Sequence, residues 1–70
     1  MAERRRVNVN QEERRLVREA HREHPNNPEL QMDWLMANIH VLPDKIQEIY
    51  TDRRRGLRRL REIIRRELDE

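Results

Sequence analysis

The 70-residue sequence contains no cysteine, no serine, no phenylalanine and a single glycine. Without cysteine the chain can form neither a disulfide nor a cysteine-ligated metal site, which fits a reducing compartment. Serine and cysteine are also the usual nucleophiles of covalent catalysis, and the lone Thr51 has no obvious base to activate it. One glycine is too few for a glycine-rich phosphate-binding loop. We therefore expect no enzyme activity and no cofactor.

Long apolar runs are also missing. No stretch approaches the roughly 18 residues of a membrane span, and no signal peptide opens the chain. We expect a soluble, intracellular protein of one domain, with no membrane partner and no small-molecule substrate. Its core should be thin, because a chain this short buries only about 60 % of its unfolded surface. Self-association is then an expected source of stability.

Charged residues make up 43 % of the chain, with 16 basic and 14 acidic side chains. They alternate with apolar residues at three- and four-residue steps, which is typical of helices. No strand-like alternation occurs, so the sequence predicts an all-α fold. The histidines His21, His24 and His40 are predicted to lie at the surface or its boundary, because no set of three converging metal ligands is visible.

Helix boundary signals predict a flexible basic arm over residues 1–9 and a three-helix domain over 10–70. The helices are expected at about 11–24, 28–40 and 43–69. Asn10 and Asn27 are predicted N-caps, because their side chains can accept hydrogen bonds from the first free backbone N–H groups. Pro25 should end the first helix, and Pro28 and Pro43 suit first helical positions. Only a turn of two or three residues separates the second helix from the third.

The predicted third helix holds most of the candidate chemistry. Residues 53–66 contain eight arginines against Glu62 alone, so this segment carries a net charge of +7 while the whole chain carries +2. Such a cluster at helical steps favours contact with a nucleic-acid phosphate backbone. The predicted nucleic-acid-binding residues are Arg53, Arg54, Arg55, Arg58, Arg59, Arg61 and Arg65, with Arg4, Arg5 and Arg6 of the arm. The arm itself reads either as a solvated tail or as a segment that contacts phosphates.

A helix over residues 43–69 would be about 40 Å long, which exceeds what two shorter helices can cover. Its C-terminal apolar residues are therefore expected to stay exposed in a monomer. The second helix also carries a surplus apolar stripe, in addition to the one that faces the core. We predict a homodimer whose interface contains Leu30, Trp34, Leu60, Ile63, Ile64 and Leu68.

The order of these elements resembles the homeodomain family, without a gap, from about Arg6 to Arg59. Arg6 and Val9 match that family's basic arm, and Asn10 and Val17 match its first helix. The second helix and turn match through Leu35, Ile39 and Val41, and the recognition helix matches through Ile46, Ile49, Tyr50 and Arg54. The resemblance implies a helix-turn-helix domain that lays its third helix in the DNA major groove.

Three residues depart from the homeodomain pattern. Ile49 replaces the usual tryptophan, and His21 falls where a core phenylalanine is expected. Asp52 occupies the position of the asparagine that reads adenine, and an ionised carboxylate can only accept hydrogen bonds. The resemblance therefore supports the fold more than base-specific reading.

A second resemblance competes with the first over residues Pro28 to Leu57. This stretch is similar to the small-subunit ribosomal protein of the fifteenth family, which binds RNA. The similarity is carried by residues 28–31, Leu35, Ile39, Leu42, Asp52 and residues 54–57. It requires short deletions and runs a helix through Pro43, which would cost about 3 kcal/mol in a helix interior.

The sequence thus predicts a DNA-binding protein of homeodomain-like type, acting as a transcription regulator in the nucleus or nucleoid. Two alternatives stay open: binding of structured RNA, and a protein-interaction module whose arginines meet an acidic partner.

Overall fold

The computed structural model of the chain describes the backbone of residues 10–69 and the side chains of residues 10–67. The predicted basic arm, with Arg4, Arg5 and Arg6, lies outside the described residues, and so does the side chain of Leu68. Within the described range the regular structure is entirely helical, as predicted. The helices are α1 (Gln11–Glu23), α2 (Pro28–Asn38), α3 (Asp44–Thr51) and α4 (Arg53–Ile64). A 3₁₀ turn, η2 (Ile39–Val41), follows α2, and a π-helical turn, η3 (Arg65–Asp69), follows α4.

Both predicted N-caps are confirmed. The Asn10 side-chain oxygen accepts hydrogen bonds from the backbone N–H groups of Glu12, at 2.7 Å, and Glu13, at 3.4 Å. The Asn27 side chain accepts one from the backbone N–H of Leu30 at 3.1 Å. Helix α1 ends one residue earlier than predicted, because His24, directly before Pro25, is already outside helical geometry. The α1–α2 turn contains Asn26 with φ of 66°, a left-handed conformation that asparagine tolerates well.

The prediction of one continuous helix from residue 43 to 69 is wrong. The chain leaves helical geometry at Asp52, which has φ −90° and ψ 106°, and α3 and α4 lie on either side of it. The Asp52 carboxylate accepts hydrogen bonds from the backbone N–H groups of Arg54, at 3.1 Å, and Arg55, at 3.4 Å. Aspartate favours such a cap because its short side chain competes with continued helix for the backbone N–H groups. Four helices therefore replace the expected three in the described part of the chain.

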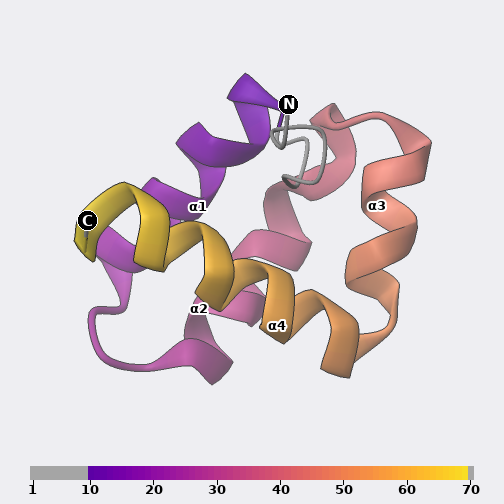
Figure 1. The fold of residues 1–70 in the computed structure, drawn as a ribbon. Helices are drawn as coiled ribbons and strands as arrows, with labels where there is room; N and C mark the ends of the chain where they lie inside the picture. The colour runs from indigo at the N-terminus through magenta and orange to yellow at the C-terminus, as the bar shows by residue number, and fades with distance from the viewer. Residues whose placement is uncertain (1–9, 70) are drawn as a thin grey trace, which may run out of the picture.

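A close approach at Gly56 accompanies this break. A Cβ atom at this position would lie 3.0 Å from the Tyr50 Cα and would collide with the end of the Met32 side chain. Only glycine lets α4 pass so near to both α2 and α3. Figure 1 shows the result: α4 crosses in front of α2, with α1 on one side and α3 on the other.

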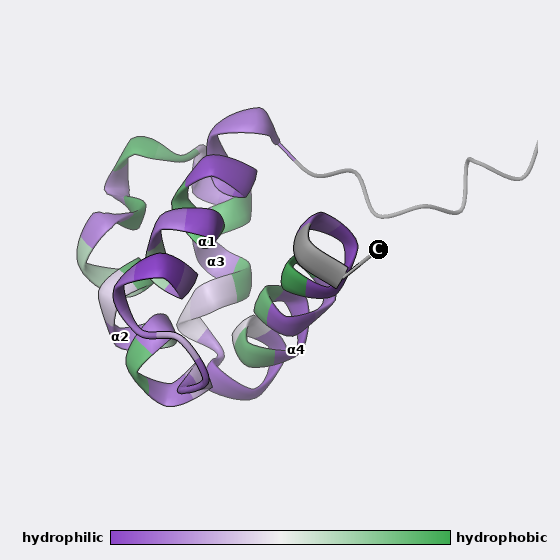
Figure 2. Cartoon of the chain, turned by 90° about the vertical axis from the view of Figure 1, so that its left-hand side faces the viewer, coloured by the Kyte–Doolittle hydropathy of each residue, from purple (hydrophilic) through white to green (hydrophobic). Residues whose placement is uncertain are grey.

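The fold-back of α4 buries the apolar residues that a straight rod would have exposed. Leu60 and Ile63 are 0 % and 2 % exposed, and they join one core with Val17, Met32 and Tyr50. Ile64 is half-buried and packs against the same core. The prediction that Leu60 and Ile63 form a dimer interface is therefore wrong, because the chain covers them itself. Figure 2 shows the hydrophobic side of α4 turned toward the other helices.

None of the helices in residues 10–69 is long and apolar enough to cross a membrane.

Candidate nucleic-acid interface

The outward side of α4 and its η3 extension is almost entirely arginine. The exposed residues on this side, apart from Arg53 at the start of α4, are Arg54, Arg55, Arg58, Arg61, Glu62, Arg65 and Arg66. Six arginines and one glutamate give this surface a net charge of +5. The opposite side of the helix carries Gly56, Leu60 and Ile63, which are buried. The amphipathic pattern of the sequence thus places the positive charge where a partner can reach it.

Four of these arginines lie along one edge of the helix, at the predicted steps of four, three and four residues. We call Arg54, Arg58, Arg61 and Arg65 the arginine row. At 1.5 Å of rise per residue they span about 16 Å. Among the described residues, none of the four forms a side-chain hydrogen bond or an ion pair. Their guanidinium groups are therefore available to an external anion.

The arginine row lines an open groove of about 800 Å³. The other side of the groove comes from α1, the following turn and the start of α2, with His21, Asn26, Pro28 and Gln31. Its apolar surface comes from Leu57 and Ile64. A second, smaller hollow of about 320 Å³ lies toward α3 and includes Arg55 and Arg66. The fold therefore places cationic side chains along both sides of the outward face of α4.

Arg59 also lines the smaller hollow, but its guanidinium group is engaged inside the fold, so its role in nucleic-acid binding stays a prediction. It is turned toward α1, where its Nε and Nη2 donate to the two carboxylate oxygens of Glu13 at 2.5 and 2.9 Å. The Glu13 side chain is fully buried, and that of Arg59 is only 16 % exposed. The hydrogen bonds that Arg59 donates to the Glu13 carboxylate stabilise the charged guanidinium group, so they raise the pKa of Arg59 above its ordinary value. The pair is a structural contact between α1 and α4.

The Tyr50 hydroxyl completes this buried polar cluster by donating to Glu13 at 2.5 Å. Burial raises the pKa of Tyr50 well above its ordinary value of 10.0, and the hydrogen bond to Glu13 adds to this effect. The cluster of Glu13, Tyr50 and Arg59 was missed in the sequence. A signal was present, because Glu13 lies in step with the buried α1 residues Leu16, Val17 and Ala20.

Arg53 is exposed but has acidic neighbours. Its Nη2 donates to Glu29 at 3.0 Å and to Asp33 at 3.1 Å, both on α2. These hydrogen bonds raise the pKa of Arg53. They also hold its guanidinium group against α2. Arg53 therefore lies apart from the arginine row, although the sequence predicted them as one cluster.

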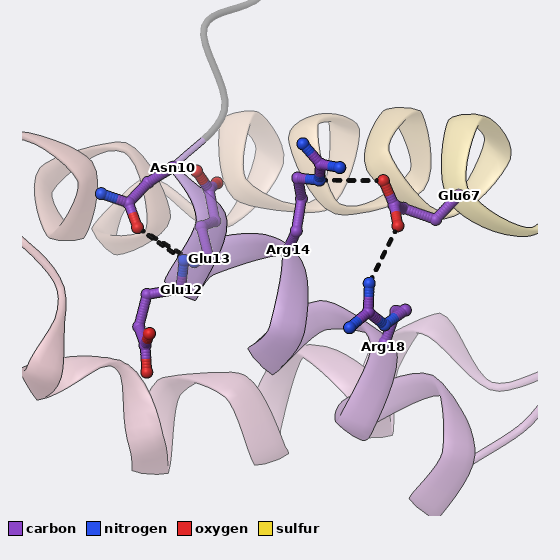
Figure 3. Close-up of polar contacts among 6 residues, drawn as sticks. All are labelled: Asn10, Glu12, Glu13, Arg14, Arg18 and Glu67. Atoms are coloured by element: carbon purple, nitrogen blue, oxygen red, sulfur yellow. Dashed lines mark hydrogen bonds and ion pairs between the residues drawn. The ribbon is translucent and has the colours of Figure 1, made fainter.

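Acidic residues near the C-terminus could have neutralised the arginine row, and Glu67 does not. Figure 3 shows its carboxylate between two arginines of α1. Arg14 Nε donates to it at 3.0 Å and Arg18 Nη1 at 3.1 Å. Since Glu67 pairs with α1, it ties η3 to that helix and leaves the arginine row without this acid.

The structure also gives the surroundings of Asp52 and of the three histidines. Asp52, at the adenine-reading position of the homeodomain pattern, caps α4 with its side chain. His21 lines the groove, His24 caps α1 and His40 is exposed. Within the described residues, no three His, Cys, Asp or Glu side chains gather as metal ligands.

Compared with known proteins, the chain matches no family model, no curated protein and no solved structure.

Proposed function

We propose that this protein binds duplex DNA, with the arginine row and its neighbours on α4 contacting the phosphate backbone. The observation that carries the proposal is the exposure of four arginines along one helix edge with no acidic partner in the described part of the chain. Unpaired guanidinium groups in such a row favour a polyanion, because each can donate two parallel hydrogen bonds to a phosphate. An α-helix also fits the DNA major groove, which is about 12 Å wide.

Contacts of this kind position a protein on DNA but carry little sequence information. Asparagine and glutamine are the usual readers of adenine, and α4 contains neither. Asp52 is engaged with the backbone of α4. If the protein regulates transcription in the nucleus or nucleoid, as the homeodomain resemblance implies, we infer that it selects sites mainly by DNA shape.

A homodimer remains part of the proposal, with a different interface from the one first expected. Leu60 and Ile63 lie in the core of the single chain. On the outer side of α2, Leu30 and Ala37 are exposed, whereas Trp34 is half-buried and packs against the core. The exposed part of α2 is the surface that we propose for a second copy.

The test is a fluorescence-anisotropy titration of a labelled duplex over a range of salt concentrations. We expect a steep fall of affinity with salt, since each phosphate contact contributes a slope of about −0.9 in log K against log [salt]. Replacing Arg54, Arg58 and Arg61 by Gln should weaken binding to all duplex sequences and flatten that slope by about 2.7.

A matched control removes the same charge elsewhere. Arg15, Arg22 and Lys45 are exposed and lie outside α4. Their joint replacement by Gln should leave the slope nearly unchanged. If the two triple variants behave alike, only net charge matters and the proposed surface is wrong.

The same titration with duplex RNA decides between the two nucleic acids. Tighter binding to RNA, lost in the same α4 variant, would transfer the proposal to RNA. No binding to either duplex at low salt would leave an acidic protein as the expected partner.

A further inference from the structure

Glu62 is the single acidic residue between Arg53 and Arg66, and it is exposed on the outward side of α4. Arg58 and Arg66 lie one turn before it and one turn after it. Within the described residues, however, its carboxylate forms no hydrogen bond and no ion pair. Both carboxylate oxygens are therefore free to accept hydrogen bonds from a bound molecule.

Glu62 lies at the centre of the outward side of α4. The groove of about 800 Å³ and the hollow of about 320 Å³ lie on either side of this helix. Of the described residues, only Arg58 and Glu62 line both of them, so these two form the ridge between them. The flanking arginines divide between the two: the groove is lined by Arg54, Arg61 and Arg65, and the smaller hollow by Arg55 and Arg66.

This arrangement decides which residues of α4 can face bases. An α-helix with its side chains is about 10–12 Å across and fills a major groove that is about 12 Å wide. The central ridge of the helix then faces the base edges at the floor of the groove, and the flanking residues face the phosphates of the two strands. The arginines on the two flanks are thus placed against phosphates, and Glu62 is placed against bases. The ridge is also the position where a negative charge lies farthest from both strands.

The chemistry of a carboxylate favours one base. An ionised carboxylate only accepts hydrogen bonds, and in the major groove the donors are the amino groups of adenine and cytosine. The adenine amino group lies between two acceptors, its own N7 and the thymine O4, and both repel a carboxylate. The cytosine amino group has an acceptor on one side only, the O6 of the paired guanine. Cytosine is therefore the base that suits Glu62.

We propose that Glu62 reads a cytosine in the DNA major groove by accepting a hydrogen bond from its N4 amino group. The inference deepens the proposed function and rests on it, because it requires α4 to lie in that groove. The contact adds one direct base reading to the selection of sites by DNA shape. Without such a contact, an acid in the middle of this arginine surface would only weaken binding to a polyanion.

The test selects bound duplexes from a library with a randomised central segment and sequences them. The unmodified protein should enrich cytosine at one position. Glu62→Gln should enrich adenine there instead, because glutamine can bond to both N6 and N7 of adenine. Glu62→Ala should lose the preference and, with one negative charge fewer, bind all sequences more tightly.

Anisotropy titration of the selected duplex gives the size of the effect. Replacing the selected C·G pair by T·A should weaken binding of the unmodified protein by about five- to tenfold. The same replacement should leave the affinity of Glu62→Ala nearly unchanged. Because Glu62 is exposed, both variants should keep the helical circular dichroism spectrum of the unmodified protein.

Glu48→Gln is the matched control. Glu48 is exposed on α3, so this variant loses the same charge away from the ridge and should keep the cytosine preference. Duplex binding without cytosine enrichment, or an enrichment that Glu62→Ala retains, overturns the inference and leaves the proposed function standing. Absence of duplex binding by the unmodified protein at low salt overturns both.

Discussion

The carboxylate of Glu13 in α1 accepts two hydrogen bonds from the guanidinium group of Arg59 in α4, across 46 positions of sequence. The Tyr50 hydroxyl of α3 donates to the same carboxylate. One buried acid thus joins three helices. Every buried side-chain nitrogen and oxygen in the described part of the chain has a hydrogen-bond partner. The cluster is a fully satisfied polar network inside a small core, and such networks are costly to break.

Replacing Glu13 by Ala should lower the free energy of unfolding by about 3 kcal/mol, because it leaves Arg59 and Tyr50 without their shared partner. We take the low end of the range for buried ion pairs, since Arg59 still reaches water with 16 % of its side chain. Urea unfolding followed by circular dichroism measures the change. Glu12→Ala is the control: Glu12 pairs with the exposed Arg15, so the loss should stay within about 0.5 kcal/mol. Equal losses in the two variants would show that the buried Glu13 cluster contributes no more to the free energy of unfolding than the exposed Glu12–Arg15 ion pair.

The raised pKa of Tyr50 predicts that stability falls as the pH rises above 10. In the unfolded chain the hydroxyl ionises near its ordinary pKa of 10.0, whereas the folded protein keeps the proton. The unfolded state then binds fewer protons, so the free energy of unfolding decreases by up to about 1.4 kcal/mol per pH unit above 10.

Tyr50 is the only tyrosine, so absorbance at the tyrosinate band reports on it alone. The band should stay absent from the folded protein at pH 11 and appear on unfolding. In Tyr50→Phe this part of the pH dependence should vanish, together with about 1 kcal/mol of stability at pH 8 from the lost hydrogen bond. A tyrosinate signal in the folded protein near pH 10 would contradict the buried hydrogen bond.

Asp52→Ala should remove the cap of α4 and lower stability by about 1 kcal/mol. Asp52→Asn should stay within a few tenths of a kcal/mol, because asparagine caps helices about as well as aspartate. The asparagine variant also loses a negative charge beside the arginine row, so we expect it to bind duplex DNA more tightly. Thermal unfolding and anisotropy titration measure the two effects. If the alanine variant is as stable as the asparagine one, the helix break does not depend on this side chain.

Gly56→Ala should destabilise the fold by about 1–2 kcal/mol. Alanine gains up to about 1 kcal/mol over glycine from helix propensity. The added Cβ, however, lies 3.0 Å from the Tyr50 backbone and against Met32, and such overpacking typically costs 1–3 kcal/mol. The neighbouring exposed Arg55→Ala has no such contact and should change stability by less than about 0.5 kcal/mol. A stabilised Gly56→Ala variant would show that α2 and α4 can move apart freely.

The local structure was largely readable from the sequence. Asn10, Asn27 and Pro25 act on backbone groups within three or four residues, so their positions alone predicted where α1 begins and ends and where α2 begins. The all-α fold followed from helical spacing. The outward position of Arg54, Arg58, Arg61 and Arg65 followed as well, because their side of the helix carries no apolar residue.

Only the tertiary structure decided what α4 packs against. Asp52 could continue a helix or cap one, and the choice depends on whether the following residues gain by folding back. That gain comes from contacts distant in sequence: Gly56 against Met32, Leu60 and Ile63 in the core, and Arg59 with Glu13. Periodicity shows that a residue belongs to one side of a helix, but it does not show whether that side meets the same chain or another. For this reason the sequence predicted an exposed rod and a dimer through Leu60, whereas the folded chain buries Leu60 and leaves Leu30 of α2 exposed.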